Sequence, residues 1–391
     1  MVDKMLAGEG DMFLAIRELR FARGRFGLMG AVVSLVALLI VLLSGLSSGL
    51  VNDGVSGLKS MPVTAFAFDA GTKTDNAFSR SVVEESQLEI WQAFPGVEAA
   101  SPVGAGMTNA TTEDGVQIDL SLFGIVPDSF MSPNVSEGST ISGLGGIVVS
   151  ETAKSDGLEL GSIITLDRLD TELEVVGFTE GQATFGHVDM AYLNIDTWRL
   201  IASGAAQPGV PTQDQVDALD FDVASVIAIQ ASDAEGLDLA AGDLQAATTA
   251  VPLKESFNSS PGYEAETLTL SMIQTFLYAI SALVVGAFFT VWTIQRQHEL
   301  AVLRAIGASA RYLLRDSLTQ AAILLVSFTA IGVGAGVGLG SIMPDGMPFA
   351  LEPTPVLTAS LITIALGLIG AAIAVLRISR IEPISALGGQ R

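Results

Sequence analysis

Four long apolar stretches constrain this chain more than any other feature of its sequence. They occupy residues 26–51, 267–294, 317–342 and 355–376. A helix that crosses the hydrocarbon layer of a bilayer, about 30 Å thick, needs about 20 mostly apolar residues, because each residue adds about 1.5 Å. All four stretches are long enough, so the sequence predicts a membrane α-helical protein with four transmembrane helices: one, then a large insertion, then three.

The first stretch has an alternative interpretation as a cleaved signal peptide, because arginines precede its apolar run. The apolar core of a signal peptide has about 7–15 residues, and residues 26–51 far exceed that length. We therefore expect this stretch to remain as a transmembrane helix.

The charged residues divide along the same boundaries. Residues 52–266 contain 33 of the 42 Asp and Glu residues and only 7 of the 19 Lys and Arg residues. The other basic residues fall within residues 1–25, 296–315 and 377–391. Because cytoplasmic loops carry an excess of Lys and Arg, the sequence predicts a multi-pass plasma-membrane protein with both termini in the cytoplasm and the large insertion outside. No basic stripe lies elsewhere, which argues against a nucleic-acid partner.

These observations predict nine segments. They are a cytoplasmic N-terminal amphipathic segment (1–25), helix 1 (26–51), an extracytoplasmic α/β domain (52–263), helix 2 with its polar first turn (264–294), a cytoplasmic amphipathic helix and loop (295–316), helix 3 (317–342), an outer turn (343–354), helix 4 (355–376) and a cytoplasmic tail (377–391).

The insertion alternates short apolar runs with Gly, Asp and Asn turns, which is typical of a mixed α/β domain. The runs Ile147–Ser150, Ile163–Leu166 and Glu174–Gly177 predict strands. Residues 80–94 and 232–247 predict helices, the second beginning at a capping box formed by Ser232 and Glu235. The chain contains no cysteine, so this domain is held by packing rather than by disulfides.

Two features of the insertion resemble metal sites only superficially. His187 is the single histidine of the insertion, and no cysteine or second histidine accompanies it. The four aspartates between Asp214 and Asp222 lack the Gly and the terminal Glu of an EF-hand loop. We interpret both as ordinary surface features.

An amphipathic segment connects the second and third apolar stretches. Leu300, Leu303 and Ile306 share one helical face, and Gly307 can end the helix. Such a helix either lies in the headgroup layer or inserts into a groove of a soluble partner.

The amino-acid sequence of this segment, from Glu299 to Ala308, resembles the coupling-helix signature of the MacB/FtsX-type ABC transporter permease superfamily. The run Ile381–Leu387 is similar to the end of the same superfamily, and the arrangement of one span, a large loop and three spans also matches. Residues 14–19, 25–28, 44–46 and 49 resemble the haem-exporting HrtB-type and the DevC-type permeases.

The resemblance implies a non-enzymatic permease subunit that forms a homodimer and docks on two copies of a cytoplasmic ABC ATPase, which holds ATP and Mg. Coupling to the ATPase would then involve Glu299, Leu300, Leu303, Arg304, Ile306 and Gly307. The chain has no cofactor of its own in this interpretation. Its sequence contains no G-x-x-x-x-G-K-[ST] loop, so a pump built on it needs a separate nucleotide-binding subunit.

If the transported ligand is haem, it can be taken sideways from the outer leaflet, near the outer halves of helices 1 and 2. The side chains predicted to line this site are Leu46, Leu50, Tyr263, Glu264, Glu266, Met272, Phe276 and Tyr278. Glu264, Glu266 and Tyr278 are the candidate ligands of the haem iron, since iron takes oxygen, sulfur or nitrogen donors. Tyr and Glu at a span end also serve as plain interfacial anchors. We expect His187 and His298 to lie away from this site.

The third span alternates glycine with larger residues from Gly332 to Gly340. Small residues four apart let helix backbones approach closely, which predicts a packing seam; a flexible half-helix is the alternative. Two other functions remain open for the whole chain: an FtsX-like mechanotransmitter that regulates a cell-wall hydrolase, and export of another lipophilic substrate. A membrane-anchored enzyme is disfavoured, because no G-x-S-x-G elbow or zinc motif is present.

Overall fold

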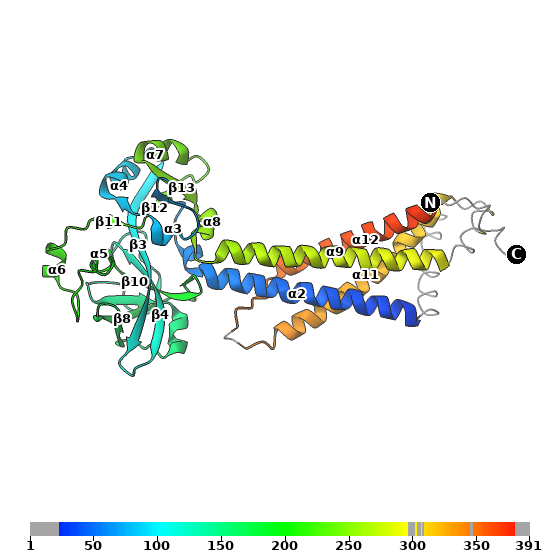
Figure 1. Ribbon diagram of the computed structural model, residues 1–391, viewed down its shortest axis with the longest axis horizontal. Coiled ribbons are helices and arrows are strands. Elements are labelled where there is room, and N and C mark those ends of the chain that lie inside the picture. Colours follow the sequence, from blue (N-terminus) through cyan, green and yellow to red (C-terminus); the bar gives the residue numbers. More distant parts are fainter. Residues whose placement is uncertain (1–22, 296–301, 303–305, 307–308, 345–346, 380–391) are drawn as a thin grey trace. The chain divides into compact units, whose positions relative to one another are not determined.

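The computed structural model describes residues 23–295, 302, 306, 309–344 and 347–379. It divides into two compact units, which we call the helical unit (residues 1–49 and 268–391) and the inserted unit (residues 50–267). The described part of the helical unit consists mainly of four long helices (Figure 1). They are α2 (Arg23–Ser60), α9 (Tyr263–Gln295), α11 (Ala310–Gly340) and α12 (Pro353–Ser379). The first residues of α9 and the last of α2 belong to the inserted unit.

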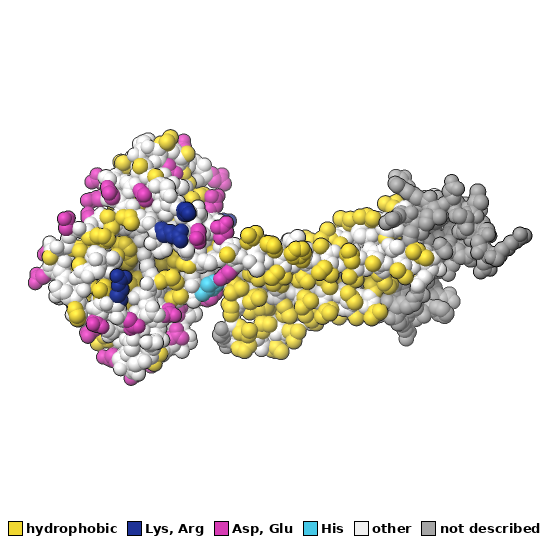
Figure 2. All heavy atoms as spheres, viewed as in Figure 1, with side chains coloured by type: hydrophobic (Ala, Val, Ile, Leu, Met, Phe, Trp, Pro, Cys, Tyr) yellow, Lys and Arg dark blue, Asp and Glu magenta, His cyan; other side chains and the backbone are white. Residues whose placement is uncertain are grey.

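All four helices are long and apolar enough to cross a membrane. On the face shown in Figure 2, apolar side chains dominate the described part of the helical unit, whereas acidic side chains are scattered over the inserted unit. The predicted fold class, four membrane helices with an inserted α/β domain, is confirmed. The helix α2 continues to Ser60 beyond a kink at Val55, whose φ and ψ are −147° and 18°.

The glycines of α11 form the predicted packing seam at alternate positions. A Cβ atom at Gly332 would lie 2.3 Å from the carbonyl oxygen of Ser34, and one at Gly336 would lie 2.9 Å from the Cβ of Val41. Gly334 has nothing within 4 Å of the same position. Because the seam follows the i, i+4 spacing, α11 approaches α2 with one face only.

Glycines of α2 also allow the turn after α11 to pack closely against that helix. A Cβ atom at Gly45 would lie 2.4 Å from the ring of Phe349, and one at Gly49 would lie 2.2 Å from the carbonyl oxygen of Pro348. The Ala350 N–H donates to the Gly45 carbonyl at 3.0 Å. Glycine is therefore required at both positions for the turn to reach the helix.

A second close crossing joins α9 to α12. A Cβ atom at Gly370 would lie 2.7 Å from the carbonyl oxygen of Ala282, and one at Gly286 would contact Gly370 itself. Around this crossing, Val285, Phe289 and Leu325 belong to one buried apolar cluster. The C-terminal part of α9, residues 281–295, which we call its inner half, is thus packed into the bundle.

The inserted unit contains a large mixed sheet with short helices around it. Its strands are β1 (Ala65–Asp69), β2 (Val83–Glu84), β3 (Val97–Thr112), β4 (Gln117–Ile125), β5 (Val135–Gly138), β6 (Gly146–Val149), β7 (Ile163–Leu166), β8 (Thr171–Thr179), β9 (Thr184–Phe185), β10 (Val188–Asn194), β11 (Val223–Ala224), β12 (Val226–Ala231) and β13 (Thr248–Pro252). Its helices are α3 (Ala77–Arg80), α4 (Glu85–Gln92), η1 (Glu151–Asp156), α5 (Ile195–Ser203), α6 (Gln213–Asp217), α7 (Leu239–Ala246), α8 (Leu253–Ser256) and η2 (Phe257–Ser259).

The main sheet has the order β13-β1-β12-β3-β4-β10-β6-β8-β5, with β7 on β3 and β8, and β9 on β10. The pairs β4–β10 and β6–β8 are parallel, and the other pairs in this sheet are antiparallel. β10 lies between β4 and β6, so the turn that precedes it is attached to the middle of the sheet.

The three predicted strands are confirmed as β6, β7 and part of β8. The predicted helix starts are wrong. Residues 83–84 pair as a strand, and α4 begins after Glu84, whose side chain forms a capping box with Gln87. Asp233, rather than Ser232, accepts from the N–H groups of Glu235 and Gly236 and makes a turn, and α7 begins later, after its N-cap Asp238.

Candidate functional site

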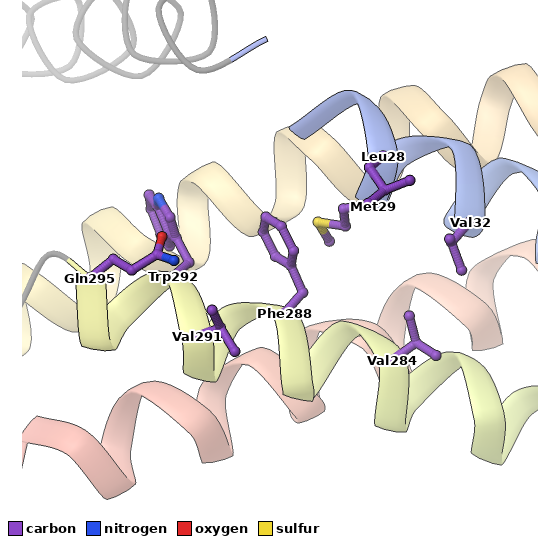
Figure 3. Close-up of a pocket in the computed structure, with 8 residues that line it drawn as sticks. All are labelled: Leu28, Met29, Val32, Val284, Phe288, Val291, Trp292 and Gln295. Carbon is purple, nitrogen blue, oxygen red and sulfur yellow. The ribbon is translucent and has the colours of Figure 1, made fainter. Parts of the chain in front are cut away.

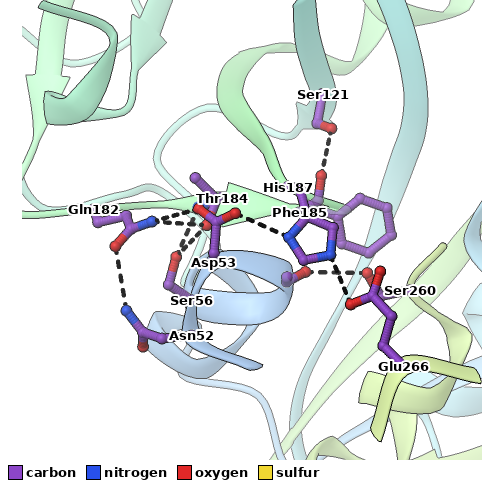
Figure 4. Close-up of polar contacts among 11 residues, drawn as sticks. Asn52, Asp53, Ser56, Ser121, Gln182, Thr184, Phe185, His187, Ser260 and Glu266 are labelled. Atoms are coloured by element: carbon purple, nitrogen blue, oxygen red, sulfur yellow. Dashed lines mark hydrogen bonds and ion pairs between the residues drawn. The ribbon is translucent and has the colours of Figure 1, made fainter. Parts of the chain in front are cut away.

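His187 is held between two carboxylates in the inserted unit. Its Nδ1 lies 2.9 Å from Oδ2 of Asp53, and its Nε2 lies 3.0 Å from Oε2 of Glu266 (Figure 4). Asp53 is in α2 and Glu266 is in the first turns of α9, so the histidine joins the segments through which the chain enters and leaves the insertion. We call these three residues the His187 cluster.

A tight turn places His187 at this position. β9 and β10 pair at Phe185 and Val188, which leaves only Gly186 and His187 between them. Both have positive φ, 60° and 64°, as the central residues of a type I′ hairpin turn do. The N–H of Gly186 donates to the carbonyl of Gly54 at 2.9 Å, and this bond fixes the turn to α2.

Further hydrogen bonds surround the cluster on the α2 side. The Gln182 amide donates to Oδ1 of Asp53 at 3.0 Å, and Asn52 donates to Gln182 at 3.2 Å. The hydroxyls of Ser56 and Thr184 lie 2.6 Å apart, and the Thr184 N–H donates to Ser56. Both oxygens of Asp53 are therefore engaged.

The geometry favours a charged imidazole. Carboxylates only accept hydrogen bonds, so a ring that bonds to one on each nitrogen must carry both protons. The side chains of His187, Asp53 and Glu266 are 28%, 29% and 41% exposed. Partial burial lowers the pKa of His187, but the hydrogen bonds and charges of Asp53 and Glu266 outweigh it, so the pKa of His187 is raised above 6.5.

The cluster is an ion-pair chain rather than a metal site. The two carboxylates contact opposite nitrogens of the ring, so they cannot share one cation with it. Among the residues that the structure describes, no group of three or more His, Asp or Glu side chains is arranged to hold a metal ion. Nearby Asp189 has its pKa raised, chiefly by burial and against hydrogen bonds from Thr152 and Ser150.

The structure brings some predicted ligand-site residues to this cluster. Glu266 belongs to it, and Tyr263 packs beside it, with its ring 6.2 Å from that of Phe257 and partly buried against the core of the unit. Glu264 is exposed and Leu50 is half-buried. Our expectation that His187 lies away from this region is wrong, because the β9–β10 turn carries it to Glu266.

The other predicted residues lie in the helical unit. Met272 and Phe276 are 51% and 63% exposed on α9, and Leu46 is 36% exposed on α2. Tyr278 packs beside Val36 and Ile40 of α2, and its hydroxyl hydrogen bonds with the side chain of Gln274.

The N-terminal part of α9, residues 263–280, which we call its outer half, packs far less than its inner half. Every residue from 263 to 280 is described, and none of them is buried. In contrast, Ser281, Val285 and Phe289 of the inner half are buried. The hydroxyls of Thr267, Ser271 and Thr275 bond back to carbonyls of their own helix, which satisfies them in an apolar environment.

A separate apolar groove lies between the inner halves of α2 and α9 (Figure 3). Its volume is about 300 Å³, and its lining residues are Leu28, Met29, Val32, Val284, Phe288, Val291, Trp292 and Gln295. None of the eight predicted ligand-site residues lines this groove.

Most of the predicted coupling segment lies outside the described residues. This applies to Glu299, Leu300, Leu303, Arg304 and Gly307. Ile306 is 79% exposed, and its N–H donates to the Val302 carbonyl at 3.0 Å, the spacing of a helical turn.

The chain is similar in sequence to several known proteins. Residues 271–383 match the FtsX-like permease C-terminal family. The chain is 24% identical to the hemin transport system permease protein HrtB of Staphylococcus haemolyticus over 378 residues, which cover 97% of this chain and 99% of the relative. It is 23% identical to an uncharacterised ABC transporter permease of Mycobacterium tuberculosis over 380 residues, with the same coverage.

Among solved structures, the periplasmic region of MacB from Actinobacillus actinomycetemcomitans aligns with 49% of this chain and 91% of its own length, at 12% identity and a TM-score of 0.35. The sequence matches confirm the predicted resemblance: residues 271–383 are similar to the FtsX-like permease C-terminal family, and nearly the whole chain is similar to permeases of hemin and ABC transport systems.

Proposed function

We propose that this chain is the membrane subunit of an ABC-type efflux pump that exports haem, or a similar amphiphile, taken from the membrane. The nearly full-length similarity to a protein named as a hemin transport permease supports the substrate class. The chain lacks a P-loop motif, so the energy comes from a separate cytoplasmic ATPase, with ATP and Mg bound there. The distribution of Lys and Arg supports cytoplasmic termini and an extracytoplasmic insertion in the plasma membrane.

The unpacked outer half of α9 is the observation that carries this proposal. A span with no buried side chain, and with exposed side chains over all but one partly buried stripe, has room for both a partner and a ligand. It offers the thioether of Met272, the ring of Phe276 and hydroxyl groups, a mixture suited to a flat apolar ligand with polar edges. A second copy of this chain would cover the rest of that surface, and the functional pump is then a homodimer on two ATPase subunits.

Within this site, Glu264, Glu266 and Tyr278 are alternative candidates for a ligand of the haem iron. They cannot all bind one iron, because Glu264 and Tyr278 are 14 residues, about 21 Å, apart along α9. Leu46, Leu50, Tyr263, Met272 and Phe276 are proposed to contact the macrocycle. The carboxylate of Glu266 already bonds to His187, so its use as a ligand requires that this bond be exchanged. Glu264 has a freely accessible carboxylate and needs no such exchange.

Titration of the purified chain with haemin, followed by absorption spectroscopy, tests this site. We expect a saturable Soret shift in the native chain and its weakening in Glu264→Gln, Glu266→Gln or Tyr278→Phe. Glu255→Gln, on α8 of the inserted unit, is the matched control and should titrate as the native chain does. Absence of any saturable shift in the native chain would contradict the haem proposal.

A mechanotransmitter is the second candidate, because the matched family model is described as FtsX-like. Such a protein transports nothing and uses its outer domain to switch a cell-wall hydrolase. Deletion of the gene separates the two functions. Haem sensitivity supports export, whereas a division or chaining defect without haem sensitivity supports the mechanotransmitter.

A further inference from the structure

His187 is attached to the sheet, although its partners belong to the two segments that lead to the spans. Its turn precedes β10, which pairs with β4 and β6. The Ser121 hydroxyl of β4 also donates to the carbonyl of Phe185, at 2.9 Å. The imidazole is therefore carried by a turn that is hydrogen bonded to the middle of the sheet of the inserted unit.

The two attachments of His187 differ in kind. On the α2 side, the ion pair with Asp53 is supported by neutral hydrogen bonds: Gly186 to Gly54, and Ser56 with Thr184. On the α9 side, Glu266 is held through Nε2 of His187. Glu266 is also the most exposed member of the cluster, at 41%. The bond to Glu266 is thus the easier of the two to break.

We propose that His187 is a positioning residue that ties the first turns of α9 to α2 and to the central sheet, so that movement of span 2 is passed to the inserted unit. This proposal rests on the proposed function, since it assumes an ATP-driven movement of the spans. When the His187–Glu266 bond holds, α9 and the sheet move together. When it breaks, the first turns of α9 keep the packing of Tyr263 and the bond of the preceding Ser260 to Gly54, so α9 follows the sheet less closely.

The effect of breaking this bond can be measured as coupling. A charge-assisted hydrogen bond biases the joined state over the parted state by about tenfold or more. We therefore expect His187→Gln to lower the amount of haem exported per ATP hydrolysed by about that factor, while the ATPase rate stays near the native value. His187→Arg keeps a positive charge with several donors and should restore most of the ratio.

The assay uses the full chain with its ATPase subunit in proteoliposomes, with haem export and ATP hydrolysis measured on one sample. Lys154→Gln is the matched control, because it breaks an ion pair of the same unit, Lys154–Glu137 at 2.7 Å, that contacts neither α2 nor α9. An unchanged export ratio in His187→Gln would overturn the proposal. If the native complex failed to export haem with ATP, that result would instead contradict the proposed function.

Hydrogen exchange of the full chain gives a measurement that needs no transport. In His187→Gln and in Glu266→Gln, amides of residues 263–267 should exchange faster than in the native chain, whereas Lys154→Gln should leave them unchanged. Because the two variants break the same bond from opposite sides, a folding defect in one does not remove the test. Unchanged exchange in both would overturn the proposal.

Discussion

Substituting alanine for Gly332 tests the packing of α11 on α2. The added Cβ would lie 2.3 Å from the Ser34 carbonyl oxygen and 2.7 Å from the Cβ of Ala37, far inside van der Waals contact. Neither a backbone oxygen nor a Cβ can rotate away, so the helices must separate. Overpacking of this kind costs about 1–3 kcal/mol.

Alanine two residues later, at Gly334, is expected to stabilise the helical unit rather than destabilise it. Gly334 lies on the other face of α11 with nothing within 4 Å of an added Cβ. Alanine there gains helix propensity, by up to about 1 kcal/mol in soluble helices. Chemical unfolding of the two purified variants in one detergent, followed by circular dichroism, should therefore separate them by about 1–4 kcal/mol. Equal stabilities for Gly332→Ala and Gly334→Ala would refute the seam.

Three more changes have defined outcomes. The folded pKa of His187 is raised, so its ion pairs stabilise the inserted unit fully below about pH 6.5, and this contribution is lost as pH rises through the folded pKa; thermal unfolding at pH 6 and pH 8 should show a drop that His187→Gln abolishes. Phe349→Ala should destabilise the helical unit by about 1–3 kcal/mol in the same chemical unfolding assay, less than the about 3–5 kcal/mol for a fully buried Phe, because its ring is half-buried against Gly45. Asp238→Ala removes the N-cap bond to the Ala241 N–H and should cost about 1 kcal/mol in urea unfolding; Asp233→Ala, which caps no helix, is its control.

The membrane helices could be predicted because their signal is length and hydropathy, which need no knowledge of contacts. The packing seam of α11 could also be predicted from a local pattern, because glycines four apart in an apolar helix usually mark a close helix crossing. The glycines at 45 and 49 appeared only as part of a family likeness. Their role depends on Phe349 and Pro348, about 300 residues away in sequence, and no local pattern reveals such a pairing.

The His187 cluster could not be predicted, because its members are separated by 134 and 79 positions. A lone histidine carries little information by itself. A usable signal was present in the two residues Gly186 and His187 between short apolar runs, since such a pair predicts a two-residue hairpin turn with His187 at its tip. Asp53 and Glu266 stand at the two ends of the insertion, so any residue that joins those ends would meet both.

The packing of α9 explains how its two halves can serve different purposes. Gly286 and Gly370 bring α9 against α12 at backbone contact, so its inner half cannot tilt without opening that crossing. Beyond Ser281, toward Tyr263, no side chain is buried, and bending there breaks few contacts within the chain. A force applied at the first turns of α9 is then resisted at the Gly286 crossing, which makes the segment near Ser281 the natural pivot. Alanine at Gly370 would push α9 and α12 apart. If the proposed export function is correct, this variant should export less haem than the native chain in proteoliposomes, even though it lies far in sequence from every proposed ligand.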